Sequence, residues 1–151
     1  MIVFSRALRA DTTIQNAAGK LLSQLAGSRR RISLALLRRI VKDKSAALVM
    51  ARDRKKIIGM GTIVFLAVPG GFHARLEDVV IDEQYRGKGL GRALTKKLIA
   101  IARGKKAEYV ELTSRPSRVA ANALYQKMGF EKKETNVYRM FLRQRFNKFS
   151  G

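Results

Sequence analysis

The chain reads Gln84-Tyr85-Arg86-Gly87-Lys88-Gly89-Leu90-Gly91-Arg92 between a predicted strand, His73 to Asp82, and a predicted amphipathic helix. Glycine at every second position allows backbone angles that side chains forbid and lets a ligand approach the chain closely. The amides of such a loop, followed by the positive end of a helix dipole, suit a phosphate or a pyrophosphate. The alternative is a glycine-rich turn that only joins a strand to a helix. The order of strand, glycines and helix favours the phosphate site.

Two common phosphate-binding motifs do not fit this stretch. A P-loop requires Gly-Lys followed by Ser or Thr, whereas Gly87-Lys88 is followed by Gly89. The dinucleotide-binding fingerprint has its third glycine one position later and opens the first strand–helix–strand unit of its domain. Here several predicted strands precede the glycines, so neither motif explains the loop.

The composition limits the class of protein. The chain has 151 residues, 46% of them hydrophobic, so we expect one domain, residues 1–151, with a sizeable core. The absence of cysteine excludes disulfides, zinc fingers and a cysteine nucleophile, and a single histidine argues against a metal site. No apolar run reaches the roughly 20 residues of a membrane-spanning helix, and the first residues lack the pattern of a secretory signal. We therefore expect a cytoplasmic protein with no metal and no membrane contact.

The charge is the most extreme property of the composition. The chain has 32 basic and 11 acidic residues, a formal net charge of +21. Such a surface attracts polyanions, which makes weak nucleic-acid binding an expectation. The basic residues are spread along the chain, so solvated basic faces are the simpler interpretation. The segment from Phe141 to Phe149 alternates basic and aromatic residues, and it suits either a nucleic-acid contact or a last strand with a frayed end.

The order of predicted elements indicates an α/β (α+β) fold in a single domain. Apolar residues at helical spacing predict helices near 33–42 and 90–103, and capping residues at their ends predict two more, near 12–25 and 117–128. Strand-forming runs occur at 2–8, 46–52, 56–68, 73–82 and 109–113, and a final hairpin around Asn136 would pair 130–135 with 137–142. We therefore expect a mixed central sheet of six to seven strands flanked by about four helices.

Two motifs in this order resemble the GNAT superfamily of acyl-CoA-dependent N-acyltransferases. The first is the family signature Gln/Arg-x-x-Gly-x-Gly/Ala, matched by residues 84–89. The second is a helix that ends in Ala-x-x-Leu-Tyr-x-x-x-Gly-Phe, matched by residues 121–130. A predicted strand lies between the two motifs, and the resemblance in element order covers nearly the whole chain.

The resemblance implies a cofactor, acetyl-CoA, with CoA as the product, and positions for its binding. The backbone at the end of the strand before the glycines would pair with pantetheine, and the loop would hold the pyrophosphate. Arg118 and Asn122 look like the basic and polar residues that one set of family sequences places before the tyrosine, so they belong to the cofactor side. The implied cofactor-binding residues are Val79, Val80, Ile81, Arg86, Gly87, Lys88, Gly89, Leu90, Gly91, Arg92, Arg118 and Asn122.

The resemblance also implies an acid, Tyr125, that protonates the departing thiolate. A phenol with a pKa of about 10 is able to donate to a thiolate whose acid has a pKa of about 8.5. The alternative is an aromatic side chain packed in the core.

Deprotonation of the amine needs an acceptor, and Glu77 and Asp78 are the candidates. Strand alternation sends them to opposite faces, so Glu77 would share a face with Val79 and Ile81. We favour Glu77, with Asp78 and ordered water as alternatives.

The leading hypothesis is an enzyme that transfers an acetyl group from acetyl-CoA directly to a primary amine of a small molecule or a protein. The alternatives are a nucleic-acid- or ribosome-binding module on a GNAT-like scaffold and a non-catalytic acyl-CoA sensor. Thr113 stands where ribosomal-type peptide N-terminal acetyltransferases often have a glutamate, which weakens that subtype. The amine acceptor is not identified by the sequence. Many GNAT domains are dimers, so a homodimer is a further expectation.

Overall fold

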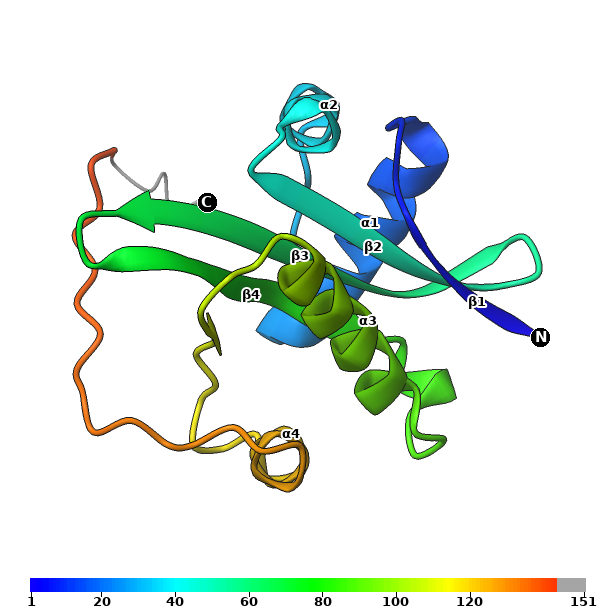
Figure 1. Cartoon of the computed structure of the whole chain (residues 1–151). Helices are drawn as coiled ribbons and strands as arrows, with labels where there is room; N and C mark the ends of the chain where they lie inside the picture. The colour runs from blue at the N-terminus through cyan, green and yellow to red at the C-terminus, as the bar shows by residue number, and fades with distance from the viewer. Residues whose placement is uncertain (144–151) are drawn as a thin grey trace.

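The computed structural model describes residues 1–143 and arranges them as one five-stranded sheet with four α-helices (Figure 1). The sheet order follows the chain, with antiparallel pairing throughout except between the last two strands, which are parallel. The strands are β1 (Ile2–Arg6), β2 (Ala46–Asp53), β3 (Lys56–Val68), β4 (Gly71–Ile81) and β5 (Val110–Glu111). The four α-helices are α1 (Thr12–Ala26), α2 (Leu34–Lys42), α3 (Leu90–Gly104) and α4 (Val119–Lys127). A short 3-10 helix, η1 (Glu83–Tyr85), lies between β4 and α3.

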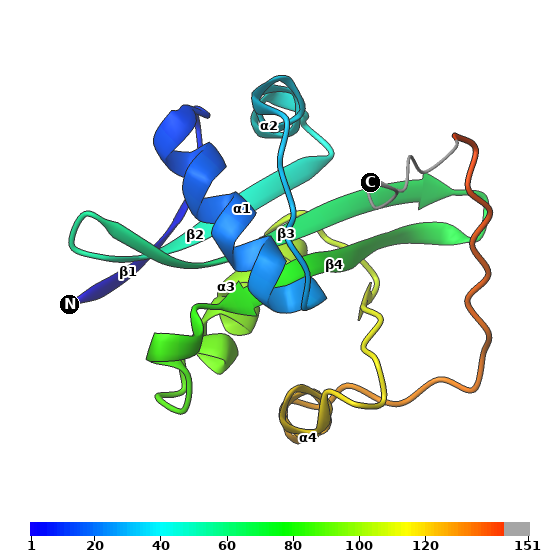
Figure 2. The ribbon, with the colours of Figure 1, turned by 180° about the vertical axis from the view of Figure 1, so that it is seen from behind.

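Helices cover both faces of the sheet. Figures 1 and 2 show α1 and α2 on one face and α3 on the other. The buried apolar side chains divide in the same way, because Leu21, Leu37 and Met50 belong to the cluster beneath α1 and α2. Ile63 and Leu94 belong to the cluster beneath α3. The predicted α/β class and the four helices are therefore confirmed.

Local signals at the helix ends explain where α1 and α2 begin. The Asp11 carboxylate accepts a hydrogen bond from the Ile14 amide at 2.9 Å, and the Ser33 hydroxyl accepts one from the Leu36 amide at 3.2 Å. Both are N-caps that satisfy otherwise unpaired amides. α1 ends at Gly27, whose φ of 68° is left-handed. Among residues 1–143, no helix is both long and apolar enough to cross a membrane.

The predicted number of strands was wrong. The sheet has five strands rather than six to seven, because residues 130–143 form neither strand of the expected hairpin. Val137, Tyr138 and Leu142 are largely exposed, so the alternating pattern of this segment does not rest on the core. A strand needs a partner edge as well as suitable residues, and propensity alone does not supply one. Residues 144–151, the end of the predicted basic-aromatic tail, lie outside the described residues.

Candidate active site

A cleft opens where β4 and β5 separate. The two parallel strands pair only at Ala74 with Val110 and at Arg75 with Glu111. Beyond this point β5 ends, and within residues 1–143 no strand pairs with the β5-facing edge of β4 from Leu76 onwards. The cleft has a volume of about 690 Å³. Its walls come from β4, the glycine loop, the start of α3, the start of α4 and the end of α1.

The cleft gathers most of the residues predicted to bind a cofactor. Those that line it are Val79, Val80, Ile81, Arg86, Gly87, Gly89, Leu90, Gly91, Arg92 and Arg118. Tyr125, the predicted acid, lines the same cleft, although it lies more than thirty residues from the glycine loop. The structure therefore brings the two sequence motifs together around one cavity.

The glycine loop has the backbone geometry that its sequence predicted. Gly87 and Gly89 have φ angles of 77° and 74°, which side chains rarely adopt. Gly89 is the N-cap of α3, and no side chain caps the helix there. The first amides of α3 are therefore left for a ligand at the positive end of the helix dipole. A Cβ at Gly91 would lie 3.7 Å from the Leu124 side chain of α4, an ordinary van der Waals distance, so packing between α3 and α4 does not require a glycine there.

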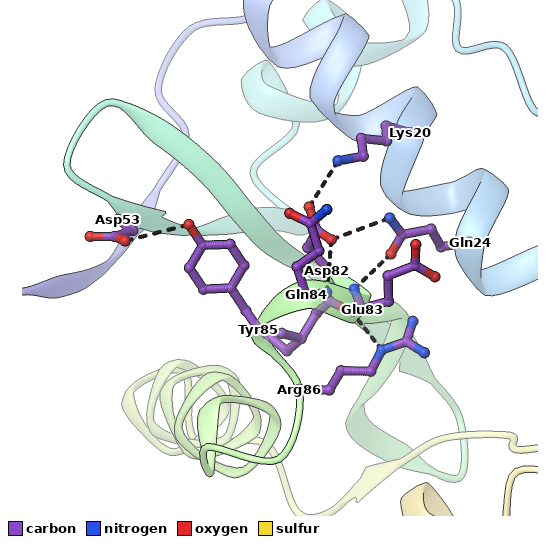
Figure 3. A network of polar contacts seen from close by, with 9 residues as sticks. Lys20, Gln24, Asp53, Asp82, Glu83, Gln84, Tyr85 and Arg86 are labelled. Atoms are coloured by element: carbon purple, nitrogen blue, oxygen red, sulfur yellow. Dashed lines mark hydrogen bonds and ion pairs between the residues drawn. The ribbon is translucent and has the colours of Figure 1, made fainter.

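A buried carboxylate fixes the start of this loop (Figure 3). Asp82 is 1% exposed, and its Oδ2 accepts a hydrogen bond from Lys20 Nζ of α1 at 3.0 Å. Its Oδ1 accepts from the Gln84 amide at 3.2 Å and from Gln24 Nε2 at 3.4 Å. Gln24 Oε1 also accepts from the Glu83 amide at 3.0 Å. α1 is thus tied to the loop that leads into the glycines.

These contacts set the ionisation of Asp82. Burial by itself raises the pKa of a carboxyl group, but the hydrogen bonds from Lys20, Gln84 and Gln24 outweigh burial, so the pKa of Asp82 lies below its ordinary value. Asp82, Lys20 and Gln24 were not among the site residues predicted from the sequence. The signal for Asp82 was its position at the end of a predicted strand, where Asp is a favoured N-cap residue for a following helical turn. No sequence signal connects it to Lys20, which is 62 residues away.

Side chains on either side of the loop pack against protein atoms. The Nζ atoms of Lys56 and Lys88 lie over the Tyr85 ring, 5.0 and 5.4 Å from its centroid. Lys88 is therefore on the tyrosine ring and is not among the residues that line the cleft. Arg86 Nε donates to the Ile81 carbonyl oxygen at 3.0 Å, which holds the loop against the end of β4 (Figure 3).

Tyr125 is buried at the edge of the cleft. It is 8% exposed, and its ring meets Phe130 edge-on with 5.6 Å between centroids. Burial raises the pKa of Tyr125 above its ordinary value of 10.0, and the nearby Arg118 charge opposes part of this shift. The phenol therefore remains protonated at neutral pH. Asn122 does not line the cleft, and its Nδ2 donates to the Arg115 carbonyl oxygen at 2.9 Å.

A β-bulge changes the directions predicted for Glu77 and Asp78. Thr62 of β3 pairs with Glu77 and Met60 pairs with Val80, so Asp78 and Val79 together face one residue, Gly61. Asp78 has a left-handed φ of 52°. Val80 packs beneath α1, whereas Val79 and Ile81 pack beneath α3, as does Leu76 before the bulge. Strict alternation therefore fails, and Glu77 does not share a face with Val79 and Ile81.

The two carboxylates also differ in their surroundings. Glu77 Oε1 lies 3.5 Å from Arg75 Nε, an ion pair on the exposed surface. Asp78 remains accessible to solvent, but neighbouring protein atoms bury part of its carboxyl group and raise its pKa above its ordinary value of 3.8. Neither residue lines the cleft itself, although Asp78 is adjacent to Val79, which does. In residues 1–143, no cluster of His, Asp and Glu is suited to hold a metal ion.

Comparison with known proteins identifies the family of this chain. The family model described as "Acetyltransferase (GNAT) family" matches residues 19–130, which include β4, the glycine loop, α3 and α4. The chain belongs to the GNAT acetyltransferase family. This match favours the GNAT interpretation over the nucleic-acid- or ribosome-binding module.

Curated GNAT relatives match this chain over part of their length. "N-alpha-acetyltransferase RimI" of Mycobacterium tuberculosis is 33% identical over 103 residues, which are 68% of this chain and 59% of that protein. "Glucosamine 6-phosphate N-acetyltransferase" of Trypanosoma brucei brucei is 42% identical over 62 residues, 41% of this chain and 40% of that protein. The chain therefore spans less than two thirds of the length of these relatives.

Solved GNAT structures share the fold. A putative acetyltransferase from Agrobacterium tumefaciens superposes with a TM-score of 0.80 at 20% identity, covering 92% of this chain and 99% of that chain. An aminoglycoside acetyltransferase from an uncultured soil metagenomic sample also gives a TM-score of 0.80, at 15% identity, covering 95% and 97% of the two chains. At such identities the likeness concerns the GNAT fold alone.

Proposed function

We propose that this protein is an N-acetyltransferase that uses acetyl-CoA to acetylate a primary amine. The proposal rests on one observation: the same cleft is lined by the open edge of β4, by the uncapped start of α3 and by the buried Tyr125. Family membership supports the class of reaction. A cytoplasmic location and a homodimer remain predictions.

The residues of the cleft fit acetyl-CoA. The edge of β4 at Val79 to Ile81 offers backbone hydrogen-bonding groups, which suit the amides of pantetheine. The left-handed Gly87 and Gly89 and the first turn of α3 offer amides, which suit a pyrophosphate. Arg86, Arg92 and Arg118 add positive charge to the same cleft. When bound there, acetyl-CoA supplies an acetyl group activated as a thioester.

The protons in such a transfer must be moved by the protein or by water. A C–N bond replaces a C–S bond, the amine nitrogen loses one proton, and the sulfur gains one. Tyr125 keeps its proton at neutral pH, so it suits the role of proton donor to sulfur. Asp78 suits the role of proton acceptor better than Glu77, because Glu77 is paired with Arg75. The raised pKa of Asp78 also makes it a stronger base than an ordinary aspartate.

The Asp78→Asn variant should therefore lose about 10²-fold or more in kcat/KM, the lower range for removal of a general base. The Glu77→Gln variant should lose less. In the wild type, kcat/KM should rise with pH through the pKa of Asp78, because only the ionised carboxylate accepts a proton, and the Asn variant should lack this limb. Steady-state rates of CoA release across pH measure both effects, with the exposed Glu134→Gln as control. A larger loss in Glu77→Gln would reverse the assignment.

Calorimetric titration with acetyl-CoA at two salt concentrations tests the proposed function. We expect one-to-one binding that persists when salt rises from about 0.15 to 0.5 M and that is tighter than binding of plain pyrophosphate, because a shaped cleft adds contacts that salt does not screen. Affinity that collapses with salt and equals that of pyrophosphate would indicate only general attraction of anions to a basic protein. That result would contradict the proposed cofactor site.

A further inference from the structure

All the charged residues in the layer formed by α1 and α2 are basic. Residues 12–42 contain seven lysines and arginines and no aspartate or glutamate. Three of the arginines, Arg29, Arg30 and Arg31, are consecutive and exposed in the connection between the two helices. Three more basic residues of this segment lie on α2, two of them in its last turn. This layer therefore has a uniform charge, which the proposed reaction at the cleft does not explain.

The connection that carries the three arginines is held against α1. After the left-handed turn at Gly27, the chain runs back along the helix, as the light-blue segment of Figure 2 shows. Ser23 Oγ accepts a hydrogen bond from the Arg30 amide at 2.8 Å, and Gln15 Nε2 donates to the Ile32 carbonyl oxygen at 2.8 Å. The backbone of this segment is therefore fixed by side chains of α1, and its arginines project from a defined surface.

This basic connection begins at the cleft. Gln24 and Leu25, in the last turn of α1, line the cleft, and Arg29 follows Leu25 by four residues. Gln24 also binds the start of the glycine loop through Asp82 and Glu83. The arginines themselves do not line the cleft, but they follow the cleft-lining end of α1 after a short turn.

The protein does not neutralise these arginines itself. Within residues 1–143, the ion pairs between side chains of opposite fixed charge join Lys20 with Asp82 and Arg75 with Glu77 and Glu111. Other carboxylates cap or close local turns, as Asp11 does for α1 and Asp43 does for Ser45. None of the three consecutive arginines takes part in these ion pairs, so their charge is available to a partner.

We propose that Arg29, Arg30 and Arg31 select the acceptor, and that the acceptor is an amine carried by an acidic peptide segment. The inference rests on the proposed function, since it names the second substrate of the same cleft. The carboxylates of the segment would meet guanidinium groups, which bind them in a bidentate geometry. The amine, a cation before it gives up its proton, would meet the carboxylate of Asp78, which is adjacent to the cleft-lining Val79.

A peptide suits this surface better than a nucleic acid does. Residues 27–44 contain no Phe, Tyr or Trp, so the connection offers no aromatic platform on which bases stack. Peptides also provide the basic aliphatic amines of lysine and the N-terminus, whereas nucleic acids provide phosphates without such an amine. The charge and the chemistry of the proposed reaction therefore agree on an acidic peptide.

Binding of defined peptides tests this assignment. The probe is a labelled peptide of one glycine with a free amine followed by six glutamates, and its neutral counterpart has six serines. Anisotropy at about 0.15 M NaCl, where the Debye length is about 8 Å, measures the Kd values. We expect the acidic peptide to bind more tightly than the neutral one. The triple variant R29Q/R30Q/R31Q should weaken binding of the acidic peptide about tenfold, because three exposed ion pairs, each weak by itself, are lost together.

A matched variant removes the same charge elsewhere. R103Q/K105Q/K106Q lowers the net charge equally at the far end of α3, where the exposed residues do not line the cleft. Unchanged binding in this control supports the proposal. Equal weakening in both triple variants, or equal binding of the two peptides, would overturn it. Tighter binding of a thymidine oligonucleotide, lost in the R29Q/R30Q/R31Q variant, would also overturn it in favour of nucleic acid. The assay contains no acetyl-CoA, so its outcome is independent of the acetyl-CoA titration.

Discussion

Replacing Tyr125 with Phe should lower kcat about 10²- to 10⁴-fold, the range typical for loss of a general acid. The substitution removes one oxygen and keeps the ring in its buried position and in its edge contact with Phe130. The Kd of acetyl-CoA should therefore not change, because the glycine loop and the edge of β4 are untouched. The effect should fall on the chemical step alone.

Two measurements separate these effects. Calorimetry gives the Kd of acetyl-CoA, and CoA release with the best acceptor from a panel of peptides gives kcat. The matched control is Tyr138→Phe, which removes the same oxygen from a tyrosine that is 88% exposed in the segment after α4. Tyr138→Phe should behave as the wild type does. A Tyr125→Phe enzyme with normal kcat would assign Tyr125 to packing and would require another proton donor.

Replacing Lys20 with Met should destabilise the fold and weaken acetyl-CoA binding together. Asp82 is nearly inaccessible to solvent, so its ionised form depends on hydrogen-bond donors within the protein. Loss of a hydrogen bond to a charged group costs about 1.5–3 kcal/mol of unfolding free energy. Asp82 also accepts a hydrogen bond from the backbone amide of Gln84, at the start of the glycine loop. Because loss of Lys20 would disturb this contact and with it the loop, the Kd of acetyl-CoA should rise.

The Lys20→Met variant should also differ from the wild type in how its free energy of unfolding changes with pH. A carboxyl group with a lowered pKa in the folded state stabilises the protein above its unfolded pKa of about 3.9, and this stabilisation is lost as the pH falls through the folded value. Without Lys20 the pKa of Asp82 should rise, so less stability should be lost between neutral and acid pH. Urea unfolding across this range measures the difference, with the exposed Lys97→Met as control. If the free energy of unfolding of Lys20→Met depended on pH as that of the wild type does, Lys20 would not be what lowers the pKa of Asp82.

The sequence predicted those parts of the site that depend on residues close together in the chain. The glycine loop, the start of α3 and the C-terminal glycine of α4 each follow from the backbone preferences of a few neighbouring residues. Tyr125 was predicted from a motif of ten neighbouring residues, and it lines the cleft. The four helices were predicted from apolar residues at helical spacing and from capping residues, which are also local properties.

The sequence could not predict contacts between residues far apart in the chain. Strand alternation assigned faces to Glu77 and Asp78, but the bulge opposite Gly61 changed the faces of the residues after it. A bulge depends on the register between two strands, and this register cannot be predicted from the sequence of either strand by itself. The expected final hairpin failed for a related reason, since the residues of 130–142 favour strands but find no partner edge among the described residues.

The sequence by itself therefore determined the local chemistry: amides in a glycine loop, a tyrosine on a helix and an excess of basic residues. Only the tertiary structure decided how these parts act together. It separated β4 from β5 to open the cleft, joined Lys20 to Asp82 across 62 residues, and held the connection that carries the three arginines against α1. The physical reason is that conformational preferences act over a few residues, whereas packing and strand register depend on the whole chain.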